Sequence, residues 1–419
     1  MATNTQWKVI PSDLNILREL AKRQLEISQV PVNQERRRLW YKHNALQGER
    51  PIVLAEAGIV FNELVPASSL SCQEEWARGL ERTLRSTIFQ YEHIQDDAVV
   101  EPYIKCNWHV NVSNYGIPIQ RVHGDIGGER GSYRWDAPIK DLLVDFEKLH
   151  PRTYSVDREG TLAWKAHLEQ VFEGILEVRL RGGFWWTVGM TWTAIDHIGL
   201  ENLMLFMYDD PEGLHRLMAF FRDDHIAFAE WLEKEGLLTP NNENDYIGSG
   251  SRGYTTELPQ TNDGIVRLKD LWVLSESQET VGISPEMYAE FVFPYQRAVI
   301  EKFGLSYYGC CEPVHERWEC LQQVPNLRSV SVSPWCDQEF IAEAMGRNYV
   351  FSRKPNPTLI STERFDEDAI RKDLRYTLDV AKNCEVELIM KDVHTLAGEP
   401  WRLARWVQIA REEIGCNTI

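Results

Sequence analysis

The sequence of 419 residues contains no run of about 18 apolar residues, so no segment is apolar for long enough to cross a bilayer as a helix. Its first eight residues have no apolar stretch of the kind that marks a signal peptide. Positive charge is scarce, because 45 Lys and Arg residues stand against 63 Asp and Glu residues, which gives a net charge of −18. An acidic surface repels phosphate groups, so nucleic acids and membrane surfaces are disfavoured as partners, and we expect a cytoplasmic protein.

The sequence also lacks low-complexity tracts, internal repeats and Gly/Ser-rich linkers, so long disordered segments are not expected. Its eight cysteines are irregularly spaced in a chain without a secretion signal, which favours free thiols over disulfides. Aromatic residues, by contrast, are plentiful, with 15 each of Trp, Tyr and Phe. Because Trp is rare in most proteins, this abundance predicts either a heavy core or an aromatic-lined site.

From residue 50 onward, short apolar runs alternate with amphipathic helical patterns. Continuous apolar runs are typical of strands that are buried on both faces. The predicted strands are residues 52–55, 98–100, 175–180, 265–274, 305–308, 328–332, 349–351 and 386–390. Eight strands with intervening helices favour an α/β fold of the (β/α)8 TIM-barrel type, with a doubly wound sheet as the alternative.

The chain divides into a short helical region and one large domain. Residues 1–49 are predicted as an N-terminal helical extension, and residues 50–419 as the barrel. The stretch from about 103 to 168 is too long for a simple loop, so it is predicted as a partly helical insertion. Residues 248–253, Gly-Ser-Gly-Ser-Arg-Gly, follow no clear strand and lack the P-loop Lys, and are predicted as a mobile lid or loop.

In a barrel, the chemistry lies at the C-terminal ends of the strands. The polar residues that follow the predicted strands are Glu56, Asp96, Asp97, Glu276, Glu279, Cys310, Cys311, Glu312, Lys354, Lys391, Asp392 and His394. Thiolates, one imidazole and several carboxylates suit a zinc site better than a magnesium site.

The most specific local signal is Cys310-Cys311-Glu312. Adjacent cysteines seldom both ligate one ion, so we expect one thiol to point at the site, the alternative being two buried thiols at a strand end. His394 follows a strand exit beside Lys391, which favours a ligand or proton-transfer role over a satisfied core histidine. Glu276 and Glu279 could supply an oxygen ligand or a general acid, although surface carboxylates are common.

Aromatic residues cluster after the predicted strand 175–180. They are Phe184, Trp185, Trp186 and Trp192. Side chains of this kind either pack in a core or form a flat slot for an aromatic ring, and here the slot is predicted.

Six short motifs occur in a consistent order between about residues 50 and 414. They are Arg50-Pro51-Ile52-Val53-Leu54-Ala55-Glu56-Ala57-Gly58, Gly189-Met190-Thr191-Trp192-Thr193, Ser284-Pro285-Glu286 with Phe293-Pro294-Tyr295, Gly309-Cys310-Cys311-Glu312, Lys354-Pro355-Asn356-Pro357 and Asp392-Val393-His394-Thr395. The series resembles the uroporphyrinogen decarboxylase superfamily, and within it the branch of corrinoid-dependent, O-demethylase-like methyltransferases.

Two departures distinguish between the branches of that superfamily. The decarboxylases carry Arg-Gln-Ala-Gly-Arg where this chain reads Ala55-Glu56-Ala57-Gly58-Ile59, and a carboxylate there disfavours a polyanionic porphyrinogen. In the methyltransferase branch, the zinc ligands are a His, a Cys and a final Cys. In this chain Gly309 stands in place of the His, Cys311 matches the first Cys, and the final Cys falls on or beside His394. The resemblance therefore implies an altered zinc set of Cys311, His394 and a carboxylate, Glu279 or Glu312, with a site that lacks zinc as the alternative.

The resemblance implies methyl transfer from a small methylated substrate to a corrinoid. The chain has no Asp-X-His-X-X-Gly motif, so the corrinoid is expected on a partner protein. Zinc would polarise the leaving heteroatom, or Glu279, Glu312 or His394 would transfer the proton. Glu56, Lys354 and the four aromatic residues are the predicted substrate-binding residues.

The preferred methyl donor is a methoxylated aromatic compound, with a methylamine as the competitor, and a homodimer is a further expectation. Two alternatives come from other classes. One is a metal-independent lyase that acts on a small carboxylated substrate through Asp96, Asp97 and His394. The other is a non-catalytic barrel that binds a small molecule.

Overall fold

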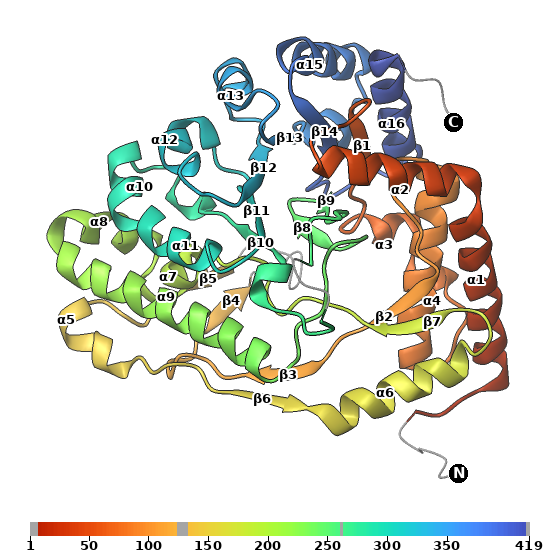
Figure 1. Cartoon of the computed structure of the whole chain (residues 1–419), viewed down its shortest axis with the longest axis horizontal. Coiled ribbons are helices and arrows are strands. Elements are labelled where there is room, and N and C mark those ends of the chain that lie inside the picture. The colour runs from red at the N-terminus through yellow and green to blue at the C-terminus, as the bar shows by residue number, and fades with distance from the viewer. Residues whose placement is uncertain (1–6, 124–132, 260–262, 416–419) are drawn as a thin grey trace.

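The computed structural model describes residues 7–123, 133–259 and 263–415 (Figure 1). The last cysteine, Cys416, and residues 124–132 of the predicted insertion lie outside the described residues. The strands are β1 Ile52–Ala55, β2 Tyr103–Cys106, β3 His109–Val112, β4 Arg121–His123, β5 Tyr133–Trp135, β6 Tyr154–Asp157, β7 Glu177–Leu180, β8 Tyr246–Gly248, β9 Ser251–Arg252, β10 Trp272–Ser275, β11 Leu305–Tyr308, β12 Leu327–Val332, β13 Val350–Arg353 and β14 Glu385–Met390.

The helices precede, connect and follow these strands along the chain. They are α1 Pro11–Gln29, α2 Pro31–Asn44, α3 Phe61–Leu64, α4 Glu75–Phe89, α5 Leu142–Asp145, α6 Arg158–Val171, α7 Thr191–Ile198, α8 Leu200–Asp209, α9 Pro211–Lys234, α10 Pro285–Phe291, α11 Phe293–Ile300, α12 Trp318–Leu321, α13 Gln338–Met345, α14 Thr358–Ser361, α15 Glu367–Val380 and α16 Trp401–Ile414. In the described part of the chain, no helix has the length and apolar character that crossing a membrane requires.

Six parallel strands form the main sheet, in the order β1-β14-β13-β12-β11-β10. Each belongs to a predicted apolar run, and all are buried, as strands covered on both faces must be. A separate parallel pair joins β2 to β7. The prediction of a mixed α/β fold with parallel strands is confirmed, whereas no closed barrel of eight strands is seen among the described residues.

Side chains and loops occupy the two edges of this sheet. At β1, the carboxylates of Asp97 and Asp96 accept hydrogen bonds from the backbone N–H groups of Val53 and Ala55, at 2.8 and 2.9 Å. The predicted strand 98–100 is therefore wrong. Asp96 and Asp97, which precede it, already accept the hydrogen bonds of the β1 backbone with which that strand would have paired.

The β10 edge is satisfied in the same manner. The side-chain amide of Asn241 donates to the carbonyl of Trp272 at 3.0 Å and accepts from its N–H at 2.9 Å. Two residues further along β10, the N–H of Val188 donates to the carbonyl of Leu274 at 2.9 Å. These contacts place residues 182–188 and 238–241 directly beside β10.

The segment predicted as a mobile lid is a buried hairpin, β8–β9, at the centre of the molecule (Figure 1). A Cβ atom on Gly248 would lie 2.3 Å from the ring of Tyr307 on β11, so only glycine allows this approach. Ser249 donates to the carbonyl of Gly309, and Ser251 donates to Glu387 on β14, both at 3.0 Å. The lid prediction is wrong because these serines are anchored to two strands of the sheet.

Helix α2 lies at the amino-terminal end of the sheet, and α1 packs against α4. His43, at the end of α2, contacts Glu385 at 2.9 Å and Glu387 at 3.3 Å, and all three side chains are buried. The Asn44 amide donates to the carbonyls of Arg252 and Tyr254, next to the hairpin. The predicted extension is thus packed into the interior of the protein.

The segment predicted as a partly helical insertion contains both strands and helices. It begins with β2, which belongs to the parallel pair, and continues through two antiparallel pairs, β3–β6 and β4–β5. Within its described residues, α5, one 3-10 turn and α6 supply the helical part.

We expect the free energy of unfolding to depend on His43 above neutral pH. Burial alone would lower the pKa of His43, but hydrogen bonds to Glu385 and Glu387 outweigh it and raise the pKa to about 9 from 6.5. Protonated His43, paired with the two glutamates, stabilises the folded state fully below pH 6.5. This contribution is lost as the pH rises through about 9.

Urea unfolding at pH 6, 8 and 10 measures this dependence. His43→Gln is expected to lower stability most at pH 6 and to flatten the profile. His394→Gln, at an exposed histidine, is the matched control. Equal losses at all three pH values would contradict the assignment.

Candidate active site

The carboxyl ends of the parallel strands bring together a group of charged and thiol side chains. Lys391 follows β14, and its Nζ lies 3.8 Å from the Sγ of Cys310, which follows β11. The same amine lies 3.2 Å from Asp392. Parallel strands end at one edge of a sheet, which is why residues 81 positions apart in the chain meet here.

Glu276, the first residue after β10, is fully buried at this edge. Its Oε2 accepts a hydrogen bond from the N–H of Gln278 at 3.1 Å, and its Oε1 has no partner among the described residues. Burial raises the pKa of Glu276 well above 4.5, and the neighbouring charges of Glu279 and Glu312 raise it further. A protonated carboxyl group with a free oxygen can act as a general acid.

The two other carboxyl groups differ in their partners. Glu279 accepts from the hydroxyl of Thr191 at 2.7 Å, its Oε1 is also without a partner, and burial raises its pKa. Glu312 accepts from the N–H groups of Ser277 and Cys310, both at 2.9 Å. The predicted acid Glu279 therefore keeps a free oxygen, whereas Glu312 holds the two strand ends together.

The adjacent thiols have different surroundings. Cys310 is buried and Cys311 is exposed, with 3.7 Å between their sulfur atoms. The hydrogen bond from Cys310 lowers the pKa of Cys311 and raises the pKa of the Cys310 thiol itself. Cys311 is thus the thiol that reaches solvent at the carboxyl edge.

The predicted zinc ligands do not form a group. His394 is exposed beyond β14, and Glu279 is directed to Thr191. Across residues 7–123, 133–259 and 263–415, no three His, Cys, Asp or Glu side chains are placed to hold one metal ion. As they lie, Cys311, His394 and Glu279 do not fit a zinc ion.

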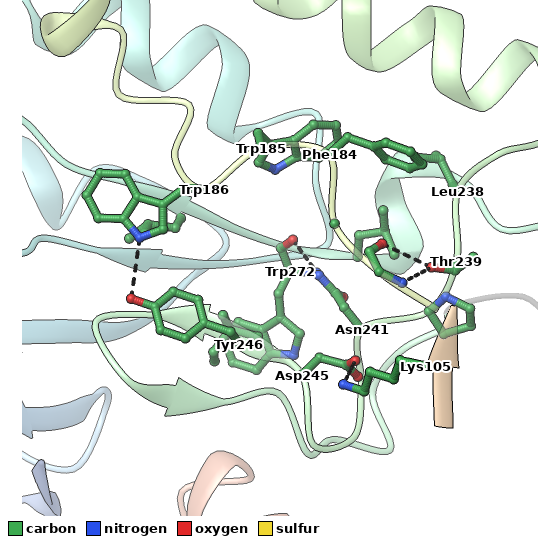
Figure 2. Close-up of a pocket in the computed structure, with 16 residues that line it drawn as sticks. Lys105, Phe184, Trp185, Trp186, Leu238, Thr239, Asn241, Asp245, Tyr246 and Trp272 are labelled. Carbon is green, nitrogen blue, oxygen red and sulfur yellow. Dashed lines mark hydrogen bonds and ion pairs between the residues drawn. The ribbon is translucent and has the colours of Figure 1, made fainter. Parts of the chain in front are cut away.

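Next to this edge lies a cavity of about 570 Å³ with aromatic walls (Figure 2). It lies between residues 182–186, residues 238–241, β8 and β10. Trp186 donates to the hydroxyl of Tyr246 at 3.4 Å, which joins the two sides of the cavity. In Figure 2, Phe184 and Trp185 lie above the cavity and Tyr246 lies below it.

Tyr246 connects the cavity with the charged group. Burial raises the pKa of its hydroxyl, and the charge of Glu56 raises it further, while Lys391 lowers it. Glu56, predicted from the end of β1, thus lies within electrostatic range of the cavity and of Lys391. Phe184, Trp185 and Trp186 line this cavity together, whereas Glu56 lines a different one, beside α3 and α4. A role of these four residues in substrate binding stays a prediction.

Two predicted substrate-binding residues lie elsewhere. Lys354 is buried under the hairpin, where it donates to the hydroxyl of Tyr307 at 2.9 Å and to the carbonyl of Ser352 at 3.0 Å. Burial lowers the pKa of Lys354 to about 7. Trp192 lines a second cavity on the other side of residues 184–186.

The aspartates of the lyase alternative have a structural role. Asp96 also accepts from the amide of Gln90 at 2.6 Å, and Asp97 receives two hydrogen bonds of 2.8 Å from Arg50. Because both carboxylates hold β1, no observation favours the lyase.

The sequence alone did not distinguish Glu276 from Glu279. The signal for Glu276 was its position as the first residue after β10. Its burial involves Gly189, where a Cβ atom would lie 2.1 Å from the Glu276 carbonyl oxygen. The chain from residues 187 to 191 can therefore cover Glu276 closely.

Comparison with known proteins adds little. No protein-family model matches the sequence, and no curated protein matches it. The structure is similar to a methyltransferase from Methanosarcina mazei, with a TM-score of 0.49 and 11% sequence identity, over 90% of this chain and 98% of that chain. A likeness this distant does not determine the reaction, so the function is inferred from the site.

Proposed function

We propose that the protein is a methyltransferase that moves a methyl group from a methoxylated aromatic compound to a corrinoid carried by a partner protein. The observation that carries this proposal is the buried Glu276, whose pKa is raised well above 4.5, at the carboxyl end of β10, the strand that also lines the aromatic cavity. The order of sequence motifs supports the same reaction.

The difficulty of the reaction lies in its leaving group. An aryl ether releases a phenoxide poorly, and protonation of the ether oxygen converts it into a neutral phenol. A reduced corrinoid supplies the nucleophile that accepts the methyl group. The proton that leaves Glu276 goes to the ether oxygen, the O–CH3 bond breaks, and the methyl group passes to the corrinoid. The phenol and a Glu276 carboxylate remain, and a proton from solvent restores the carboxyl group.

The cavity suits an aromatic donor. Phe184, Trp185, Trp186 and Tyr246 offer flat apolar surfaces for stacking. The charged residues on its wall are compensated, since Lys105 and Asp245 form an ion pair at 2.8 Å. An aromatic ring can therefore bind without leaving a charge unpaired in the cavity.

A demethylation assay tests the proposal. The purified chain is mixed with a reduced corrinoid protein and, in turn, a methoxybenzoate, a methoxyphenol and tetramethylammonium, and the demethylated product is measured. Phenol formation from a methoxylated ring is expected. A lack of transfer from any methoxy, methylamine or methylthiol compound would reject methyl transfer and leave the binding-protein alternative. Zinc and the homodimer stay predictions, which metal analysis and light scattering of the same sample check.

We expect Trp186→Ala to raise KM for the aromatic donor roughly two- to tenfold, because one stacking contact is worth about 0.5–1.5 kcal/mol. Trp186 is 45% exposed, so the change should leave the fold intact. Trp335→Ala, at a tryptophan that is 67% exposed, is the matched control. An unchanged KM in the Trp186 variant would place the donor outside this cavity.

A further inference from the structure

A second cavity, of about 390 Å³, lies on the other side of residues 184–186. Its remaining wall comes from α7, α9 and the segments around Tyr115 and Arg152. Besides Trp185 and Trp186, it contains Trp192 and Phe228, so its surface is largely aromatic. A volume of this size accommodates a single substituted ring.

Arg152 is held rigidly at this cavity. Its backbone N–H and its Nε donate to Asp224 at 3.0 and 2.6 Å. The hydroxyls of Tyr115 and Tyr154 donate to the same carboxylate at 3.0 and 3.1 Å. The guanidinium carbon lies 5.0 Å from the ring centroid of Tyr115 and 5.3 Å from that of Phe228.

This arrangement leaves the terminal nitrogens of Arg152 without a carboxylate partner in the described part of the chain. Asp224 is occupied by its four donors, and besides Asp224 the guanidinium interacts with the hydroxyl of Tyr154. A guanidinium that is fixed through Nε presents its terminal N–H groups to a carboxylate in a planar geometry.

His225, on α9, adds a second polar group to the wall. Its Nε2 is buried without a partner among the described residues. Burial and the charge of Arg152 lower the pKa of His225 to about 4, so the ring is neutral near pH 7 and can form one further hydrogen bond. Buried polar atoms without partners are rare in proteins and often mark a place where a ligand binds.

We propose that this second cavity binds an aromatic carboxylate of the benzoate type. The ring stacks among Trp185, Trp192 and Phe228, and the carboxylate accepts from Arg152. A quaternary ammonium is disfavoured although the walls are aromatic, because the positive charge of Arg152 occupies the same cavity. The proposal does not depend on methyl transfer, since it rests on Arg152 and the aromatic wall and not on Glu276.

Calorimetric titration of the full chain with benzoate, benzamide and benzyltrimethylammonium tests this site. One benzoate per chain is expected to bind, and both other compounds should bind at least about tenfold more weakly, because they lack the carboxylate that pairs with Arg152. Comparable binding of benzamide or the ammonium, or no binding of benzoate, would overturn the proposal.

Variants locate the bound benzoate. Arg152→Lys and Trp192→Ala are each expected to weaken binding by about tenfold, through loss of the planar fork and of a stacking surface. Trp192 is 42% exposed, so its variant remains informative if Arg152→Lys does not fold. Trp401→Ala, at a tryptophan that is 48% exposed, and Tyr246→Phe, in the first cavity, should leave binding unchanged. Weakening by Tyr246→Phe without weakening by Trp192→Ala would place benzoate in the first cavity and reject the second.

Discussion

Glu276→Gln is expected to lower kcat for methyl transfer by about 10²–10⁴-fold, the usual contribution of a general acid. Glutamine keeps the size of the side chain and its hydrogen bond from Gln278, but it has no proton to give to the ether oxygen. The KM of the aromatic donor should change little, because the cavity walls remain intact. Steady-state kinetics with the corrinoid protein measures both constants.

The same variant should be more stable than the wild type at high pH. The pKa of Glu276 is raised in the folded state, so folding carries a cost that begins as the pH rises above 4.5 and grows until the folded carboxyl ionises. Glutamine removes that cost. Thermal unfolding is therefore expected to shift upward at pH 8 and to stay unchanged at pH 4.

Glu363→Gln is the matched control, because Glu363 is exposed and lies on a different element. It should leave kcat and thermal unfolding unchanged. If Glu276→Gln retained wild-type kcat, Glu276 would not be the acid. Glu279, the other carboxyl with a free oxygen, would then be tested by Glu279→Gln in the same assay.

Asp97→Ala is expected to lower the free energy of unfolding by about 3–5 kcal/mol, since removing one member of a buried ion pair leaves the others uncompensated. Arg50 donates to both carboxylate oxygens at 2.8 Å, Arg411 donates at 3.1 Å, and the N–H of Val53 donates at 2.8 Å. The alanine variant removes the acceptor of the Val53 N–H and the carboxylate that offsets the charges of Arg50 and Arg411 next to β1. Urea unfolding at pH 7 measures the loss.

Two further variants separate charge from shape. Asp97→Asn keeps one acceptor but no charge, so its loss should be intermediate. Asp379→Ala, at an aspartate whose side chain is 83% exposed, should cost less than about 1 kcal/mol, as is usual for surface ion pairs. A small loss in Asp97→Ala would show that β1 does not depend on this carboxylate.

The stabilisation by Asp97 also has a defined pH dependence. Burial alone would raise the pKa of Asp97, but the hydrogen bonds and charge of Arg50 outweigh it and lower the pKa below 3.8. The contribution is therefore fully present above pH 3.8 and is lost as the pH falls through the lower, folded-state pKa. The difference between wild type and Asp97→Asn should shrink at acidic pH.

The sequence by itself determined most strands of the sheet and the edge at which its charged residues gather. Apolar runs identified β1, β10, β11, β12, β13 and β14, because a strand that is buried on both faces is rich in apolar residues. Residues just past those runs, such as Glu56, Glu279 and Cys311, lie at the carboxyl edge, since parallel strands end on the same side.

Only the tertiary structure decided how the edges of the sheet are satisfied and which carboxyl group is buried. The pairing of Asp97 with Arg50 and of Asn241 with Trp272 joins side chains to backbone or charge across 30 or more positions, which no local pattern encodes. The Gly-rich hairpin looks flexible in sequence, and it is held because Tyr307 and Glu387 lie where its glycine and serine fit. Glu276 and Glu279 are alike in sequence, and they differ because the distant segment 187–191 meets them differently: Gly189 packs on Glu276, whereas Thr191 donates to Glu279.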